Sequence, residues 1–198
     1  GGRYSGWETA EEYLSGHVRT KLALAQEAAK TDPEYERNVT ALLDNQPPRI
    51  GIEDIGFRVG TIYIEPEMFQ DFVYETFQTP EWQRHRPNMR GYSKEITVNY
   101  SPEMNQWKVT NSSGMSDVLS TETFGTKRLN AYELTELLLN QKRAVVNDYR
   151  ELPDGRTERV FNAKETILAR ECQDKIEQAF HDWVMADKDR IQIIEDRF

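Results

Sequence analysis

The sequence predicts an α+β fold that is mostly helical, a single domain over residues 1–198 with about six helices and two β-hairpins. Two observations carry this prediction. Helix-capping residues followed by apolar residues at steps of three and four recur along the chain, and two pairs of short alternating runs flank turn sequences. Hydrophobic residues make up 37% of the chain and charged residues 30%, which is enough apolar content for a core.

Helical signals dominate the first part of the chain. Thr9 and Glu12 have capping-box spacing, which predicts a short helical turn that stops at Ser15-Gly16. Ser15 can cap a second helix that ends near Lys30. Asp32-Pro33 is typical of a helix start, and this third helix closes at Pro47-Pro48. Residues 1–6 are expected to be flexible or, like Gly1-Gly2, left over from cloning.

The middle of the chain alternates between extended and helical patterns. Residues 51–64 read as a short strand or an irregular extended run, and their glycines lack the spacing of a phosphate-binding loop. A helix is predicted from Pro66 to about Thr79, and another from Asn130 to about Gln141. Hairpins are predicted over 96–109, with a loop at 101–105, and over 145–161, with a turn at Pro153-Asp154-Gly155. Both hairpins are expected to pack on the helical layer.

The longest predicted helix runs roughly from Asn162 to Ala186, and Asn162 and Glu165 form a second capping-box signal at its start. Its apolar residues recur on one face, which suggests that they form a structural stripe: Leu168, Cys172, Ile176, Phe180 and Trp183, joined by Ala179 and Val184. Such a stripe either forms part of the core or docks against a neighbouring domain. Cys172 lies on this stripe and reads as a small buried hydrophobe, since the chain holds no second cysteine.

Residues 82–94 depart from the acidic average of a chain whose formal net charge is −9. Aromatic residues, Trp82 and Tyr92, and His85 are interleaved there with four cations: Arg84, Arg86, Arg90 and Lys94. Arginines supply phosphate contacts and aromatic rings supply stacking faces, so these four cations are the candidate DNA contacts. The alternative interpretation is an exposed loop whose arginines pair with the carboxylates of this protein.

No catalytic or metal site is predicted. The three histidines and Cys172 show no zinc-ligand spacing, and Cys172 and His181 lie about 13 Å apart along one helix, too far for a nucleophile and its base. No apolar run approaches the length of a membrane span, so no membrane partner is expected, and a single cysteine is compatible with the cytoplasm.

One stretch resembles a known family signature. It is similar to the "DEYLSGNVREKL" signature of large DNA methylase–helicase fusion proteins of phages, plasmids and conjugative elements, with His17 and Thr20 departing from it. The matching residues are Glu12, Tyr13, Leu14, Ser15, Gly16, Val18, Arg19, Lys21 and Leu22. Weaker matches continue in the family's order from Asp32-Pro33 to the terminal Arg197-Phe198, and they are sparse between Gln78 and Lys127.

The resemblance implies an accessory domain that lies upstream of a superfamily-two helicase motor of the DEAD/DEAH or Swi/Snf-like type. The motor's Gly-Lys-Thr loop and the Asn-Pro-Pro-Tyr/Phe motif of an adenine methylase are absent from the sequence, so no enzymatic activity and no cofactor are expected for these residues. ATP and S-adenosylmethionine are expected elsewhere in the parent protein. The implied function is to assist DNA engagement or to couple the motor to the methylase, with weak binding of DNA by the domain itself; the alternative is a protein-interaction module that recruits a phage or conjugation partner.

Overall fold

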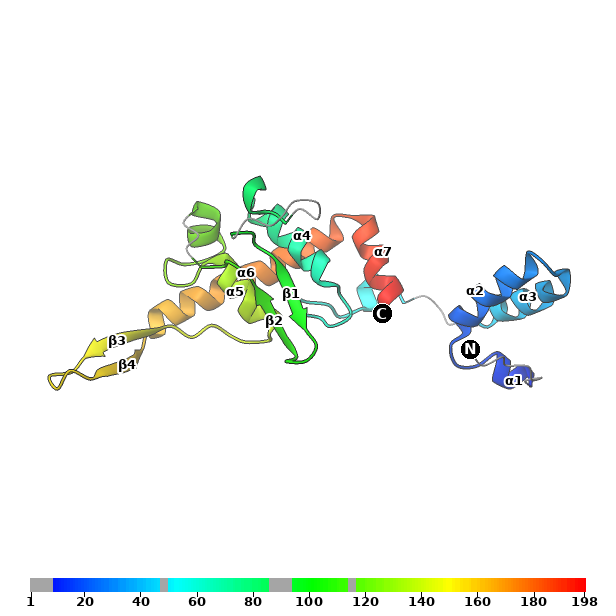
Figure 1. Ribbon diagram of the computed structural model, residues 1–198, viewed down its shortest axis with the longest axis horizontal. Helices are drawn as coiled ribbons and strands as arrows, with labels where there is room; N and C mark the ends of the chain where they lie inside the picture. The colour runs from blue at the N-terminus through cyan, green and yellow to red at the C-terminus, as the bar shows by residue number, and fades with distance from the viewer. Residues whose placement is uncertain (1–8, 47–49, 86–93, 114–116) are drawn as a thin grey trace. The chain divides into compact units, whose positions relative to one another are not determined.

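The computed structural model describes residues 9–46, 50–85, 94–113 and 117–198, which group into two compact units, Gly1–Ile50 and Gly51–Phe198 (Figure 1). The prediction of an α+β fold is confirmed: the described residues form seven α-helices and two antiparallel two-stranded sheets. The sequence predicted one domain over 1–198, whereas each unit has a core of its own. Residues 1–6 lie outside the described part of the chain.

The first unit is a small helical module. It consists of α1 (Ala10–Tyr13), α2 (Val18–Ala29), a 3₁₀ turn (Pro33–Tyr35) and α3 (Glu36–Asp44). The α2 and α3 helices pack against each other around three buried side chains, Val18, Ala25 and Leu42. Thr9 and Glu12 form the predicted capping box, but Ser15 does not cap α2: its hydroxyl donates to the Glu12 carbonyl at 3.0 Å, and α2 begins after His17 without a side-chain cap.

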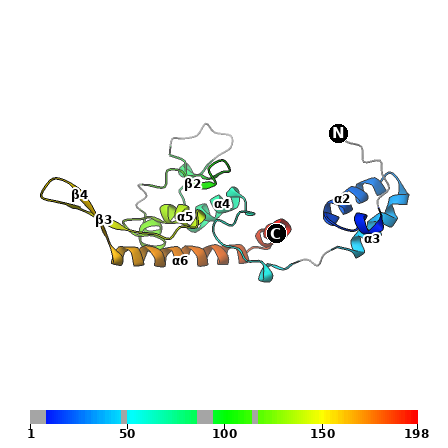
Figure 2. The same cartoon turned by 90° about the horizontal axis from the view of Figure 1, so that it is seen from below.

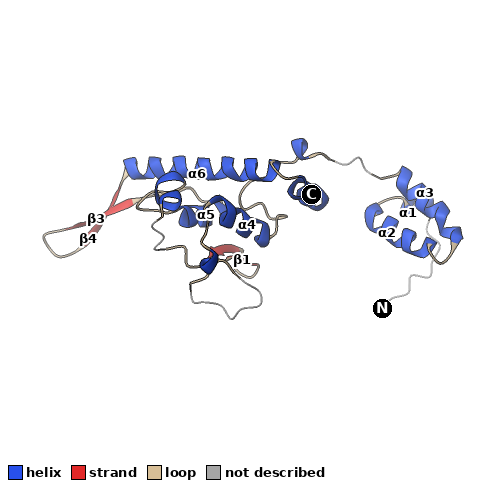
Figure 3. Ribbon diagram, turned by 90° about the horizontal axis from the view of Figure 1, so that it is seen from above, coloured by secondary structure: helices blue, strands red, loops and turns tan. Residues whose placement is uncertain are grey.

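The second unit is built in three layers (Figures 2 and 3). The long helix α6 (Ala163–Met185) forms one side, α4 (Pro66–Thr76) and α5 (Ala131–Leu139) pack on it, and the hairpin of β1 (Val98–Ser101) and β2 (Gln106–Val109) covers them. Aromatic rings fill the space between α4 and α6, where Phe180 contacts Phe69 and Phe72 with ring centroids 5.3 and 5.1 Å apart.

Shorter elements complete this unit. They are 3₁₀ turns at Ile52–Asp54 and Glu81–Gln83, a π-helical turn at Leu119–Thr123, and the helix α7 (Lys188–Arg197). No strand forms in residues 51–64, all of which are described; the irregular alternative holds, because Ile62 points into solvent rather than alternating into a sheet. The α7 helix was not predicted, although Asp187 caps it and Ile191 and Ile194 lie on its inner face.

The second hairpin differs from the prediction that both hairpins pack on the helical layer. Its strands β3 (Asn147–Glu151) and β4 (Thr157–Phe161) pair in register from Asn147–Phe161 to Glu151–Thr157 and extend past the start of α6. Every residue of β4 is exposed, whereas Val98, Trp107 and Val109 of the first hairpin are buried. We call residues 147–161 the β3–β4 arm.

Polar side chains of α6 hold the chain that leads into the arm. Gln173 accepts from the Ala144 N–H at 2.8 Å and donates to the Lys142 carbonyl at 2.9 Å, and the Thr166 hydroxyl accepts from the Val146 N–H at 2.9 Å. Asn162 accepts from the Glu165 N–H as predicted, but its own N–H donates to the Val146 carbonyl, so the reciprocal half of the predicted capping box is replaced by a backbone bond. Alternate residues 142, 144 and 146 therefore bond to one face of a helix.

Candidate nucleic-acid interface

The basic segment at 82–94 begins where α4 ends. The Arg84 guanidinium lies at the C-terminal end of this helix: a terminal nitrogen donates to the Tyr74 carbonyl of the last turn at 3.2 Å, and its Nε donates to the Thr79 carbonyl, just beyond the helix, at 2.7 Å. Helix C-termini leave carbonyls without intrahelical partners, and a cation there is favoured by the helix dipole. Arg84 also lies 3.4 Å from the Glu81 carboxylate. Its charge therefore serves to hold the fold locally.

The two ends of the basic segment are tied together. Arg84 and Ile96 form a parallel bridge, in which the Ile96 N–H donates to the Gln83 carbonyl at 2.8 Å. The Tyr74 hydroxyl accepts from the His85 N–H at 2.9 Å and donates to the Ile96 carbonyl, so that one side chain of α4 links both ends. Burial raises the pKa of Tyr74, and this keeps the hydroxyl protonated as a donor.

A second contact, between His85 and Glu95, also links the two ends of the basic segment. The His85 Nδ1 lies 2.9 Å from the Glu95 carboxylate, which is itself mostly buried. No sequence pattern indicates that Tyr74 and Glu95 belong to this base, because Tyr74 has the pattern of a helix residue and Glu95 that of a surface acid. The base nevertheless brings the described residues on the two sides of the segment, Arg84-His85 and Glu95-Ile96, close together.

The four candidate DNA contacts differ in their surroundings and in whether the structure describes them. Arg84 is engaged as described, Lys94 is exposed, and Arg86 and Arg90 lie outside the described residues. Trp82, which precedes the segment on its 3₁₀ turn, exposes 61% of its surface. An exposed indole and an exposed ammonium group therefore stand at opposite ends of the tied segment.

The signature stretch of the first unit forms a compact turn between α1 and α2. The Lys21 ammonium donates to three carbonyls at the end of α1, those of Glu12, Tyr13 and Ser15, at 2.9, 3.1 and 3.2 Å. Gly16 has φ +73°, a conformation that a side chain would strain.

The apolar residues of the signature pack in the core of the first unit. Val18 is buried, and Tyr13, Leu14 and Leu22 pack around it, while Arg19 is exposed. The arrangement explains why a Glu, a Gly and a Lys occur at this spacing: the carboxylate caps the start of α1, the glycine turns the chain, and the ammonium group caps the end of α1.

The face of α6 that is buried in the structure differs in part from the stripe predicted from the sequence. Cys172, Ile176 and Phe180 are buried, but Leu168 is 40% exposed, and Ala169, Thr166 and Gln173 take the buried positions instead. Periodicity missed them because two of these residues are polar and are buried through hydrogen bonds to residues 142–146.

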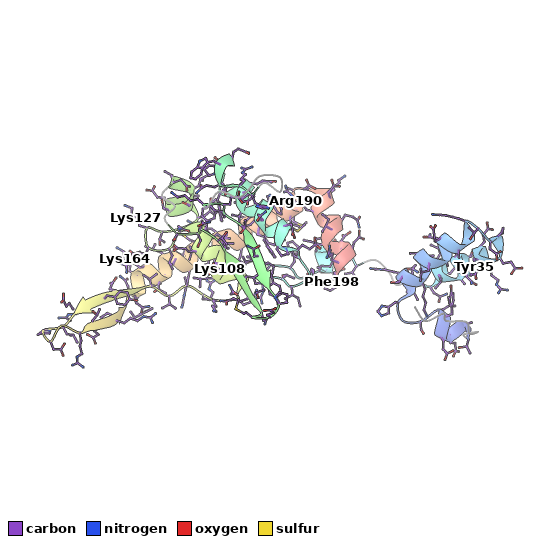
Figure 4. The ribbon with its side chains drawn as sticks, in the orientation of Figure 1. Tyr35, Lys108, Lys127, Lys164, Arg190 and Phe198 are labelled. Carbon is purple, nitrogen blue, oxygen red and sulfur yellow. The ribbon has the colours of Figure 1, made fainter. Side chains whose placement is uncertain are left out.

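Trp183 is half-buried and already has partners. Its indole N–H donates to Glu75 at 2.7 Å, and the Arg190 guanidinium of α7 lies 3.6 Å from the ring centroid (Arg190 in Figure 4). Arg190 also pairs with Glu75 at 2.8 Å, and the Trp183 ring packs near the rings of Phe72 and Phe180, with centroids 5.7 and 6.2 Å away. The indole thus joins α4, α6 and α7 within the unit.

Comparison with known proteins places the second unit in a family. Residues 58–198 match the family described as "Domain of unknown function (DUF8437)". The chain belongs to this family. No match to the chain was found among curated proteins or among solved structures. The DUF8437 region begins within the second unit, so the signature stretch of the first unit lies outside it.

The described residues of the DUF8437 region and of the first unit contain no group of three or more His, Cys, Asp or Glu side chains that could hold a metal ion. The Cys172 thiol donates to the Gly125 carbonyl at 3.5 Å. Burial raises the pKa of this thiol, and the raised pKa makes Cys172 a poor nucleophile. Among the helices that the structure describes, none combines the length and apolar character needed to cross a bilayer.

A partly buried carboxylate lies elsewhere in the DUF8437 region. Glu177 of α6 accepts a hydrogen bond from the Val59 N–H at 3.1 Å. Burial raises its pKa, and the nearby Asp174 adds to this, while the Val59 N–H and the cations Arg58 and Arg143 oppose it. The native state therefore binds the Glu177 proton more tightly than the unfolded chain does.

We expect Glu177 to make stability depend on pH. Because the folded pKa is raised, its stabilising contribution is complete below the ordinary glutamate range and is lost as pH rises through the folded pKa. Glu177→Gln keeps an oxygen for Val59 and removes the titration, so the fall in unfolding free energy across this window should be smaller in the variant. Urea titrations at a series of pH values measure this. Burial raises the pKa of Asp71 as well, and that effect remains in both proteins; equal pH profiles would contradict the prediction.

Proposed function

We propose that this chain is a non-catalytic accessory domain that helps a DNA-processing protein to engage DNA. The observation that carries the proposal is the tied base of the basic segment, where Arg84, Tyr74 and Ile96 bring its two ends together. The sequence between these two ends contains the cations Arg86 and Arg90.

The exposed side chains at the two ends of the basic segment suit contact with a nucleic acid. The exposed indole of Trp82 offers a stacking face for a base, and the ammonium group of Lys94 offers a phosphate contact. Arg84 is not part of the proposed contact surface, because its donors are used at the end of α4. The chain's net charge of −9 makes binding weak and strongly dependent on salt.

The resemblance to methylase–helicase fusion proteins supports a position for this domain within a larger protein of that kind. In such a protein it would lie upstream of a helicase motor, in the cytoplasm, and would couple the motor or the methylase to DNA. ATP and S-adenosylmethionine would be bound by those other domains. The structure of the signature stretch adds a physical reason for that sequence, since its glutamate, glycine and lysine build one turn.

The DNA contact predicts a specific salt response. Replacing Arg86, Arg90 and Lys94 by alanine should weaken DNA binding at low salt and flatten the plot of log K against log salt by up to about 0.9 per lost contact on duplex, or about 0.7 on single strands. Fluorescence anisotropy with labelled single-stranded and duplex oligonucleotides at several salt concentrations measures both quantities. Stability should hardly change, because Arg84 and the tied base are kept.

A matched control removes the same charge elsewhere. Lys142, Lys175 and Lys188 are exposed, and they lie outside the basic segment. Their triple alanine variant should bind DNA with nearly the slope of the original protein. If the original protein binds no DNA at low salt, or if both triple variants lose affinity equally, the basic segment is not a DNA contact.

The second candidate function is a protein-interaction module. Trp183 offers it little support, since its ring is covered by Arg190 and its indole N–H is bonded to Glu75. The observation that favours a protein contact is the β3–β4 arm, where Tyr149 and Phe161 expose 72% and 58% of their surfaces. Tyrosine and arginine are enriched where proteins meet, and the arm carries both.

A further inference from the structure

The β3–β4 arm is a two-stranded ribbon with two open edges. Such a ribbon is only marginally stable alone in water, and each open edge carries backbone N–H and C=O groups that can pair with another strand. At the base of the arm, Asp148 pairs with Arg128 at 3.0 Å and accepts from the Asn162 side chain at 2.8 Å.

The hydrogen bonds of the arm show which residues of β3 face its open edge. The Asn162 N–H donates to the Val146 carbonyl, and the Leu152 N–H donates to the Arg156 carbonyl. Because bonded residues alternate along an antiparallel ladder, residues 146, 148, 150 and 152 direct their backbone groups toward β4. The backbone groups of Asn147, Tyr149 and Glu151 therefore point outward. Arg128 donates to the Asn147 carbonyl from outside the ladder, which agrees with this assignment and occupies the edge at that end of β3.

Two opposite charges of β3 flank Tyr149, with Asp148 before it and Arg150 after it, and Glu151 ends the strand. If β3 pairs antiparallel with β3 of a second copy, centred on Tyr149, each Asp148 lies opposite the Arg150 of the other copy. The two Tyr149 residues then exchange both backbone hydrogen bonds. Opposite charges that face each other across a pair of strands are favourable, and a two-fold axis repeats the gain.

Other registers of the same edge are unfavourable. A shift of two residues in either direction keeps the outward groups opposed, but it places Asp148 opposite Asp148 or Arg150 opposite Arg150. On the open edge of β4, the register centred on the strand places Arg159 opposite its own copy. Charges on edge strands usually prevent pairing, whereas this order of charges permits one register.

We propose that the β3 edge of the arm is a self-association surface, on which a second copy of this chain adds its β3 strand to form a four-stranded sheet. The occupant is this chain itself because the edge is complementary in charge to its own copy. The two arms then bury the outward backbone groups of Tyr149. This inference does not depend on DNA binding, since the basic segment takes no part in it.

Sedimentation equilibrium of the full chain tests the proposal. At physiological salt, where repulsion between the acidic molecules is screened beyond about 8 Å, we expect a concentration-dependent equilibrium between monomer and dimer. Arg150→Glu replaces both attractive pairs by repulsive ones in a single change, and it should weaken the dimer about tenfold or more. Lys175→Glu makes the same charge change at an exposed position outside the arm and should leave the dimer nearly unchanged.

A backbone variant separates edge pairing from contact through side chains. Proline is tolerated on an edge strand where the N–H faces solvent, so Tyr149→Pro should keep the arm and abolish the dimer. Tyr149→Cys should form a disulfide-linked dimer on mild oxidation, because the two residues meet on the axis at about 5.5 Å between Cα atoms. Cys172, the other cysteine of that variant, is buried.

Two results would overturn the proposal. One is a chain that stays monomeric at every concentration, which would leave the β3 edge to a strand of another protein or to solvent. The other is a dimer that keeps its affinity in both Tyr149→Pro and Arg150→Glu, which would place the contact on a different surface.

Discussion

Phe180→Ala is expected to lower the free energy of unfolding of the second unit by about 3–5 kcal/mol, the range found when a buried phenylalanine is truncated. Phe180 is fully buried, and its ring contacts the rings of Phe57, Phe69, Phe72 and Trp183. Truncation removes these contacts and leaves a cavity among side chains that belong to different elements and cannot close together. Denaturant titration followed by tryptophan fluorescence measures the change, since Trp107 and Trp183 lie in the same unit.

Leu168→Ala is the matched control on the same helix. The sequence placed Leu168 and Phe180 on one stripe, but Leu168 is 40% exposed, so its truncation should cost less than about 1 kcal/mol. Equal losses for the two variants would mean that α6 buries the face predicted from periodicity. A loss below about 1 kcal/mol for Phe180→Ala would contradict the observed core.

Gly60→Ala should destabilise the second unit by about 3 kcal/mol or more, because two costs add. Gly60 has φ +85°, where a side chain is strained, and an added methyl group would overlap the Leu139 carbonyl oxygen and come within 2.9 Å of its carbon. Both are backbone atoms at the end of α5, so no rotamer change relieves the overlap.

Gly155→Ala separates the two costs. Gly155 lies at the turn of the arm with φ +79°, but nothing lies within 4 Å of the position where a methyl group would be added. Only the conformational cost of about 1–2 kcal/mol applies, and it falls on the arm rather than on the core. Thermal unfolding followed by circular dichroism should therefore show a large shift for Gly60→Ala and a small one for Gly155→Ala. A comparable shift for both would mean that the Leu139 carbonyl yields.

The sequence predicted those elements whose signals are local. Asn130 and Glu133 form the capping box that begins α5, and Pro66 begins α4, because caps depend on residues three positions apart. The turn at Pro153-Asp154-Gly155 is likewise a local signal, and it lies between β3 and β4.

Long-range features escaped prediction for a physical reason. Nothing in the local sequence shows that Gln173 and Thr166 find partners in residues 142–146, so two polar residues were not expected on the buried face of α6. The pattern of the second hairpin resembles that of the first, yet only the first finds a layer to cover. For the candidate site, the sequence predicted the basic segment but not the role of Arg84, because the carbonyls it contacts belong to residues as far as ten positions away.

The bond between Asn162 and Val146 closes the base of the β3–β4 arm before the arm begins. Insertion or loss of residues between these two positions changes no buried side chain of the core, since every residue of β4 is exposed and none of β3 is fully buried. A change in the length of the arm would therefore leave in place the residues of α6 that hold positions 142–146. In this chain, the arm is a segment through which a contact can be gained or lost without refolding of the core.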